Sequence, residues 1–188
     1  GKGFGKWVAK VRPLKGGVKI DPLDAELKNI NFVGSVDWLT VKEQQKTSVK
    51  GAFKAGNLSD VMTAMGMDPV ITSSSAKLNT KGLGWPGSPF DLDIDQVAGP
   101  FTLKVKNGSF LKVKSGFIGR AWGALNIESW GSGTVAKKGL GFDSIQGDFV
   151  IKEGMLTIKK THVDAPAVNM DIKGVLNLKK DTVDANLD

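Results

Sequence analysis

The stretch VNMDIKGVLNL, from Val168 to Leu178, alternates between apolar and polar side chains. One parity of this stretch holds Val168, Met170, Ile172, Gly174, Leu176 and Leu178, and the other parity is mostly polar. Successive side chains of a strand point to opposite faces, so the pattern predicts a half-buried strand of eleven residues. At about 3.3 Å per residue the strand would be roughly 36 Å long, about twice the usual length. The function of the chain therefore depends on what covers this long apolar face.

The same alternation recurs along the chain and predicts a mainly β fold. Strong strand candidates span residues 90–95, 101–106, 147–152 and 155–159, and weaker ones span residues 18–20, 25–32, 34–41, 48–54 and 75–83. Asn107-Gly108 and Glu153-Gly154 stand between such runs, where a tight hairpin needs positive φ. We therefore expect antiparallel hairpins that stack side by side into a sheet.

Two short segments have helical instead of strand spacing. The first contains Leu58, Val61, Met62 and Met65, with Asn57 or Ser59 as a cap and Gly66 as a stop. The second contains Ile118, Ala121, Trp122 and Leu125. We expect two short amphipathic helices that cover an apolar face of the sheet, because each has only three turns and few cationic flanks for binding a membrane surface.

The length and apolar content of the chain are sufficient for one sizeable domain, and its charged residues limit the partners that we expect. The 188 residues are 40% apolar and carry a formal net charge of +7, with no cysteine and with Arg12 and Arg120 as the only arginines. The lysines alternate along the predicted strands and look scattered, so we expect no nucleic-acid partner, although a basic surface can attract anionic lipid headgroups. No apolar run reaches eighteen residues. The final alternating run, Val183, Ala185 and Leu187, suggests a piece of a longer β-rich protein.

The residues give little support for catalysis. His162 is the only histidine, no Gly-x-Ser-x-Gly elbow is present, and the Gly-rich stretches lack the ending of a phosphate-binding loop. On a strand, Asp91, Asp93 and Asp95 would lie about 6.6 Å apart along the axis, which is too wide for a compact metal site. We therefore expect a protein that is not an enzyme, with no catalytic residues, metal or cofactor. Trp7 and Trp130 are a possible exposed pair for stacking on a saccharide.

Several motifs resemble one known family over nearly the whole chain. The most specific are WPGSP at residues 85–89 and GLGFDSIQGDF at residues 139–149, joined by NGSFLKV at residues 107–113 and GVLNL at residues 174–178. These resemble the C-terminal region of the YhdP family, which are AsmA-like proteins of Gram-negative bacteria. The chain departs from the pattern of this family at two places. The stretch Trp130–Thr134 is shorter than the corresponding segment of relatives, and residues 119–125 contain fewer leucines than in relatives.

The resemblance implies a long, curled antiparallel sheet that forms an open apolar groove, like a folded taco. It also implies a single groove segment over residues 1–188, periplasmic and close to the outer membrane, within a longer protein anchored in the inner membrane. Such proteins carry phospholipid between the two membranes, so the implied partners are phospholipid acyl chains. The lining expected from the alternating strands consists of Phe90, Leu92, Ile94, Phe101, Leu103, Val105, Phe149, Ile151, Val168, Met170, Ile172, Leu176 and Leu178.

Two other functions fit the alternating pattern. A closed structural or protein-docking β domain would bury the same apolar faces against each other. A saccharide-binding module would instead depend on exposed tryptophans.

Overall fold

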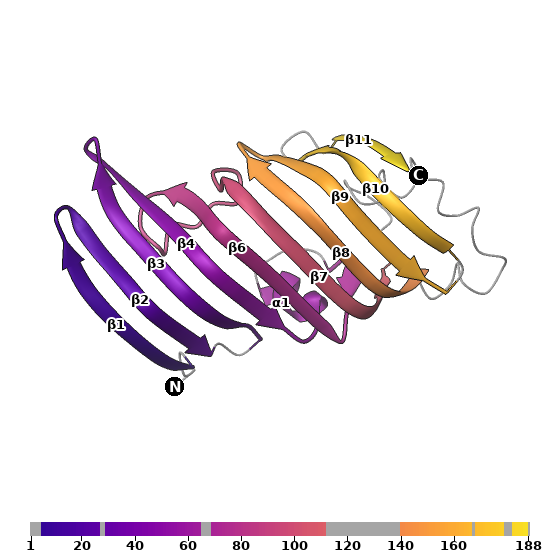
Figure 1. The fold of residues 1–188 in the computed structure, drawn as a ribbon, viewed down its shortest axis with the longest axis horizontal. Helices are drawn as coiled ribbons and strands as arrows, with labels where there is room; N and C mark the ends of the chain where they lie inside the picture. Colours follow the sequence, from indigo (N-terminus) through magenta and orange to yellow (C-terminus); the bar gives the residue numbers. More distant parts are fainter. Residues whose placement is uncertain are drawn as a thin grey trace.

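The computed structural model describes residues 5–26, 29–64, 69–111, 140–166, 168–178 and 182–187. Most of them form one twisted antiparallel sheet (Figure 1). Its strands, in order across the sheet, are β1 (Lys6–Leu14), β2 (Gly17–Glu26), β3 (Asn31–Val41), β4 (Gln44–Ala55), β6 (Ser75–Pro86), β7 (Gly99–Phe110), β8 (Leu140–Lys152), β9 (Met155–Ala165), β10 (Val168–Asn177) and β11 (Thr182–Leu187). The short strand β5 (Ile71–Thr72) pairs with β7 beside this series.

The sheet is open, because the series ends at β1 on one side and at β11 on the other. Sequence neighbours are also spatial neighbours along the series, as expected for stacked hairpins. The mainly β fold and the antiparallel sheet predicted from the sequence are therefore confirmed. The described strands do not form the two closed sheets of the alternative domain.

One helix, α1 (Leu58–Ala64), lies between β4 and β5. Asn57 caps it, because its Oδ1 accepts a hydrogen bond from the Ser59 amide at 3.1 Å. The first predicted helix is thus confirmed. Its predicted stop at Gly66 and the whole second predicted helix at residues 118–125 lie outside the described residues, as does the stretch Trp130–Thr134.

The two predicted hairpin turns have different outcomes. Glu153 and Gly154 join β8 to β9 with φ of 53° and 77°, which confirms that turn. Asn107 also has a positive φ, at 46°, but Gly108 does not, and β7 continues to Phe110. The turn predicted at Asn107-Gly108 was wrong, because a two-residue hairpin of this type needs positive φ at both positions.

Two strand predictions were also wrong. Residues 25–32 do not form one strand, because β2 ends at Glu26 and β3 begins at Asn31. Residues 90–95 form a loop between β6 and β7. Two of the aspartates in this loop accept hydrogen bonds from its own backbone, Asp91 from the Ser88 amide at 2.9 Å and Asp93 from the Asp95 amide at 3.0 Å. Such local bonds favour turns over a strand.

Three β-bulges interrupt the alternation without changing which face is apolar. They lie at Asp21-Pro22 in β2, at residues 81–82 in β6 and at residues 159–160 in β9, where the register skips one residue. Ile20 and Leu23 therefore face the same side of the sheet across the first bulge. A bulge also increases the local twist of its strand.

Candidate functional site

The register of the strands places the buried apolar side chains on one face of the sheet, which we call the inner face. A single register row crosses it from β2 to β10, through Leu23, Gly34, Gly51, Thr80, Phe101, Phe149, Ile158 and Gly174. Neighbouring rows carry most of the buried core. The opposite face, which we call the outer face, carries most of the charged residues of the strands.

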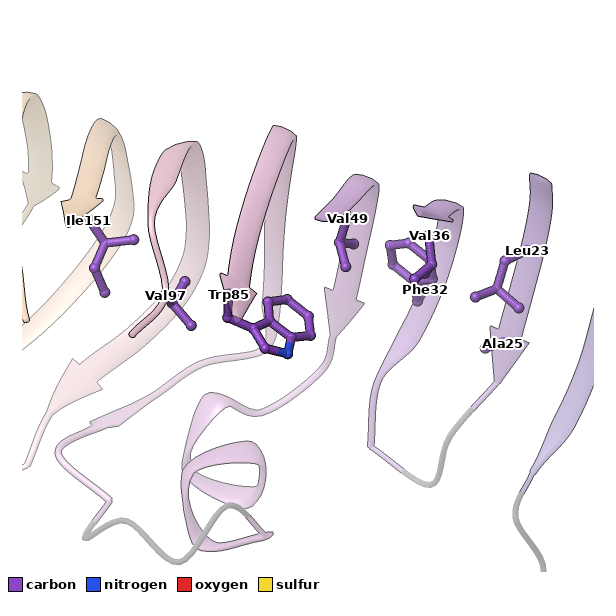
Figure 2. Packing of buried hydrophobic residues seen from close by; sticks show 8 residues of the cluster. All are labelled: Leu23, Ala25, Phe32, Val36, Val49, Trp85, Val97 and Ile151. Atoms are coloured by element: carbon purple, nitrogen blue, oxygen red, sulfur yellow. The ribbon is translucent and has the colours of Figure 1, made fainter. Parts of the chain in front are cut away.

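The first part of the inner face is a cluster of buried residues from β2 to β8. Figure 2 shows its eight members, Leu23, Ala25, Phe32, Val36, Val49, Trp85, Val97 and Ile151. Trp85 is 8% exposed, and its indole Nε1 donates a hydrogen bond to the Ser88 carbonyl oxygen at 3.0 Å. Val97 belongs to the loop between β6 and β7, so this loop is anchored to the inner face by both residues.

Glycines leave room for an aromatic ring over this part of the sheet. A Cβ at Gly34 would be 2.8 Å from Cζ of Phe32, and one at Gly51 would be 3.1 Å from Cε2 of the same ring. The rings of Phe32 and Phe53 pack with centroids 4.5 Å apart. The two glycines are therefore needed for close approach of the Phe32 ring to the strands.

The second part of the inner face is a cluster between β6 and β10. Its buried members are Ala76, Val105, Phe142, Ile145, Val163, Ala165 and Met170. Leu58 of α1 and Ile71 of β5 pack against it, so these two elements cover part of the inner face at one edge of the sheet.

Polar side chains on the inner face are few and are mostly satisfied by the backbone. Thr47 is fully buried, and its hydroxyl donates to the Gly87 carbonyl oxygen at 2.9 Å. The Thr80 hydroxyl donates to the Pro100 carbonyl oxygen at 2.8 Å. The buried hydroxyl of Thr161 has no hydrogen-bond partner in the described part of the chain. The inner face therefore presents few unpaired polar groups that would disfavour contact with a hydrocarbon chain.

Most of the predicted lining residues lie together on the inner face. Those with the inner parity are Phe101, Leu103, Val105, Phe149, Ile151, Met170, Ile172 and Leu176. Leu178 packs against the first cluster just beyond β10. Val168 begins β10 opposite Ala165. The structure thus brings residues from three distant stretches of the sequence onto one surface.

Phe90, Leu92 and Ile94 do not lie on this surface. They belong to the loop between β6 and β7 and are 88%, 50% and 49% exposed. Their placement on a groove-lining strand was wrong, because the aspartates between them bond to the loop backbone and leave the apolar side chains in solvent.

The prediction missed much of the inner face of β2, β3, β4 and β6. The missed residues include Leu23, Phe32, Val36, Val49 and Trp85. The alternation in residues 34–41 and 48–54 was a usable signal for Val36 and Val49. Val97 had no such signal, because its burial comes from a loop that folds back onto the sheet.

The remaining candidates for chemistry do not converge. His162 Nδ1 lies 2.9 Å from Asp171 Oδ1 on the outer face, where the two residues are directly opposed on β9 and β10. The hydrogen bond from His162 lowers the pKa of Asp171 below its usual value. Among the described residues no group of three or more His, Cys, Asp or Glu is arranged to hold a metal ion.

The tryptophans proposed for saccharide stacking are not brought together in the described structure. Trp7 is 50% exposed on the edge strand β1, whereas Trp130 lies outside the described residues.

A separate polar cavity of about 620 Å³ lies at the edge of the sheet that carries α1. Its lining comes from the ends of β2, β3 and β4 and from the start of α1 and β6, and comprises Glu26, Asn29, Asn31, Lys54, Ala55, Gly56, Asn57, Asp60, Ser74 and Ser75. The volume is within the usual range for ligand pockets, about 300–1,000 Å³.

Comparisons with known proteins identify relatives of the chain by sequence. The chain is 22% identical over 148 residues to the intermembrane phospholipid transporter YhdP of Escherichia coli (strain K12), a match that covers 76% of the chain and 12% of that protein. The chain thus spans about an eighth of the length of this relative. No solved structure matches the chain. None of the described helices is long and apolar enough to cross a bilayer. The model of the YhdP protein family matches residues 1–188, and the chain belongs to that family.

Proposed function

We propose that this segment shields the acyl chains of phospholipids along its inner face, as part of a bridge that carries phospholipid through the periplasm to the outer membrane. One observation carries the proposal, namely that two clusters of buried apolar side chains share one face of the sheet between β2 and β10, and that this sheet remains open at both sides. Membership of a family with a relative named as an intermembrane phospholipid transporter supports it.

The energetics explain why such a face suits lipid transport. Exposing two acyl chains of about fifteen methylenes each to water costs on the order of 20 kcal/mol, at about 0.8 kcal/mol per CH₂. Aliphatic and aromatic side chains remove this cost without directional bonds. Acyl chains are then held weakly at each point and can slide along the face.

Partly buried residues of the inner face are the natural contacts for acyl chains. Leu103, Ile172 and Leu176 have the inner parity but are not fully buried by their neighbours. The fully buried residues, such as Val105, instead hold the sheet in shape.

Native mass spectrometry of the protein purified without detergent tests this proposal. We expect phospholipid adducts on the wild-type chain. Leu103→Gln should reduce the adducts, whereas Thr102→Gln, on the outer face of the same strand, should leave them unchanged. Circular dichroism checks that both variants fold. A folded wild-type protein without adducts, or equal loss in both variants, would contradict the proposal.

A further inference from the structure

One group of the described lysines lies on neighbouring strands of the sheet, which their scattered positions in the sequence did not indicate. The adjacent strands β4, β6 and β7 contain seven lysines and no Asp or Glu. This number equals the whole formal net charge of +7. All seven are exposed, and they are Lys46, Lys50, Lys54, Lys77, Lys81, Lys104 and Lys106.

Three of these lysines are direct neighbours across the strands. Lys54 on β4 is opposite Lys77 on β6, and Lys77 is opposite Lys104 on β7. We call Lys54, Lys77 and Lys104 the basic row. Directly opposed residues have Cβ atoms about 4.5–5.5 Å apart, and like charges at such positions destabilise a sheet.

Within the described part of the chain no ion pair offsets this repulsion. The described carboxylates near the basic row include Glu26, which lies two strands beyond Lys54, Asp60, which lines the same cavity as Lys54, and Asp148, which is opposite Thr102 and Lys160. None of these three forms an ion pair with the row. Three adjacent ammonium groups are thus exposed without an ion-pair partner among the described residues.

The surroundings of the row indicate which kind of anion it fits. The next outer positions along the three strands carry Ala52, Asn79 and Thr102. These strands present neither arginine nor an outward aromatic ring that would read or stack on nucleic-acid bases. Lysine attracts phosphate as a point charge, without the planar fork of arginine. The row therefore favours phosphate groups on a surface over a base-specific ligand.

Two members of the basic row lie near the edge of the sheet that carries α1, whereas Lys104 lies in the middle of β7. Lys54 is one residue from the end of β4, and Lys77 is two residues from the start of β6. Lys54 also lines the polar cavity at this edge. A lipid crossing this edge would thus have its headgroup beside the row and its acyl chains beside the inner face.

We infer that the basic row is a docking surface for the headgroups of anionic phospholipids in a bilayer. The choice of phospholipid as the source of phosphate rests on the proposed function, whereas the anionic partner follows from the charges alone. Each lysine near an anionic bilayer surface contributes by electrostatic attraction, and this attraction falls off within a Debye length.

Vesicle flotation tests the inference with a matched pair of variants. The first replaces Lys54, Lys77 and Lys104 with Gln, and the second replaces Lys10, Lys42 and Lys173, which are exposed but dispersed. Both lose three charges. On vesicles of phosphatidylglycerol and phosphatidylcholine, we expect the row variant to bind about 100-fold more weakly than wild type at low salt, and the dispersed variant to keep most of its affinity.

Other outcomes of the same experiment would overturn the inference. They are equal loss in the two variants, equal wild-type binding to pure phosphatidylcholine vesicles, or binding that does not weaken as salt rises. A single-stranded oligonucleotide that binds the row while anionic vesicles do not would also overturn it. Lipid adducts in native mass spectrometry should persist in the row variant, because the inner face is unchanged. A negative flotation result would therefore contradict headgroup docking by the basic row without contradicting the proposed function.

A stability measurement separates docking from a structural role for the row. Lys77→Gln relieves two like-charge contacts, so we expect the melting temperature to rise by about 1–3 °C at low salt, with a smaller rise at high salt. Lys173→Gln, outside the row, should change it less. A lower melting temperature for Lys77→Gln would show that the row stabilises the sheet, which would contradict the inference.

Discussion

Phe101 and Phe149 stack across the middle of the sheet, with ring centroids 5.2 Å apart and ring planes 12° from parallel. They are directly opposed on β7 and β8, in the register row that crosses the inner face. Offset or stacked aromatic pairs stabilise beyond the area that they bury. The contact joins β7 to β8 on the inner face.

Replacing Phe149 should therefore be costly. It is 9% exposed, and Phe149→Ala should destabilise the fold by about 3–5 kcal/mol, since it removes buried area and leaves a cavity. Phe90→Ala is a matched control, because Phe90 is 88% exposed and its loss should change stability by less than about 0.5 kcal/mol. Urea unfolding followed by circular dichroism measures both. Similar values for the two variants would argue against the packing described for this face.

The glycines under Phe32 should be sensitive to a single added methyl group. A Cβ at Gly34 would be 2.1 Å from the Lys50 carbonyl oxygen, so Gly34→Ala must shift the strand or the ring and should cost about 1–3 kcal/mol or more. A Cβ at Gly82 would have nothing within 4 Å, so Gly82→Ala should be nearly neutral or slightly stabilising. Thermal unfolding of the two variants compares them. A neutral Gly34→Ala would rule out the close approach.

The pair His162 and Asp171 should give a measurable pH dependence. The hydrogen bond from His162 lowers the pKa of Asp171 below its usual 3.8, so the ionised carboxylate of Asp171 contributes stability above that pH. This contribution should be lost as the pH falls through the lowered pKa. In carbon-13 NMR titrations, His162→Ala should raise the Asp171 pKa toward 3.8. Lys173→Gln, which removes only a weaker charge effect, should raise it less, and equal shifts would contradict this assignment.

The sequence was sufficient for the fold class and for much of the inner face, because period-two alternation directly reports which side of a strand is buried. Prediction from the sequence failed where one local pattern is compatible with two different backbone structures. Asn107-Gly108 resembles a hairpin turn, but β5 pairs with this part of β7 and Phe142 lies over Gly108, so the strand continues. Alternation at residues 90–95 likewise fits a loop in which aspartates bond to the backbone.

Cross-strand features could not be predicted, because register is a property of the folded sheet. Lys54, Lys77 and Lys104 are 23 and 27 residues apart in sequence and look independent there. Only pairing of β4 with β6 and of β6 with β7 brings them into one row. The same holds for Val97, whose burial depends on a loop that no periodic pattern describes.

Photo-crosslinking in cells at adjacent residues of β10 tests the central claim most directly. Ile172 has the inner parity, whereas Lys173 is exposed on the outer face and lies outside the basic row. With a photoreactive residue at each position in turn, we expect phospholipid to be captured at position 172 and little at position 173. Equal capture at the two positions, or none at 172 in a folded protein, would contradict an inner face that holds acyl chains.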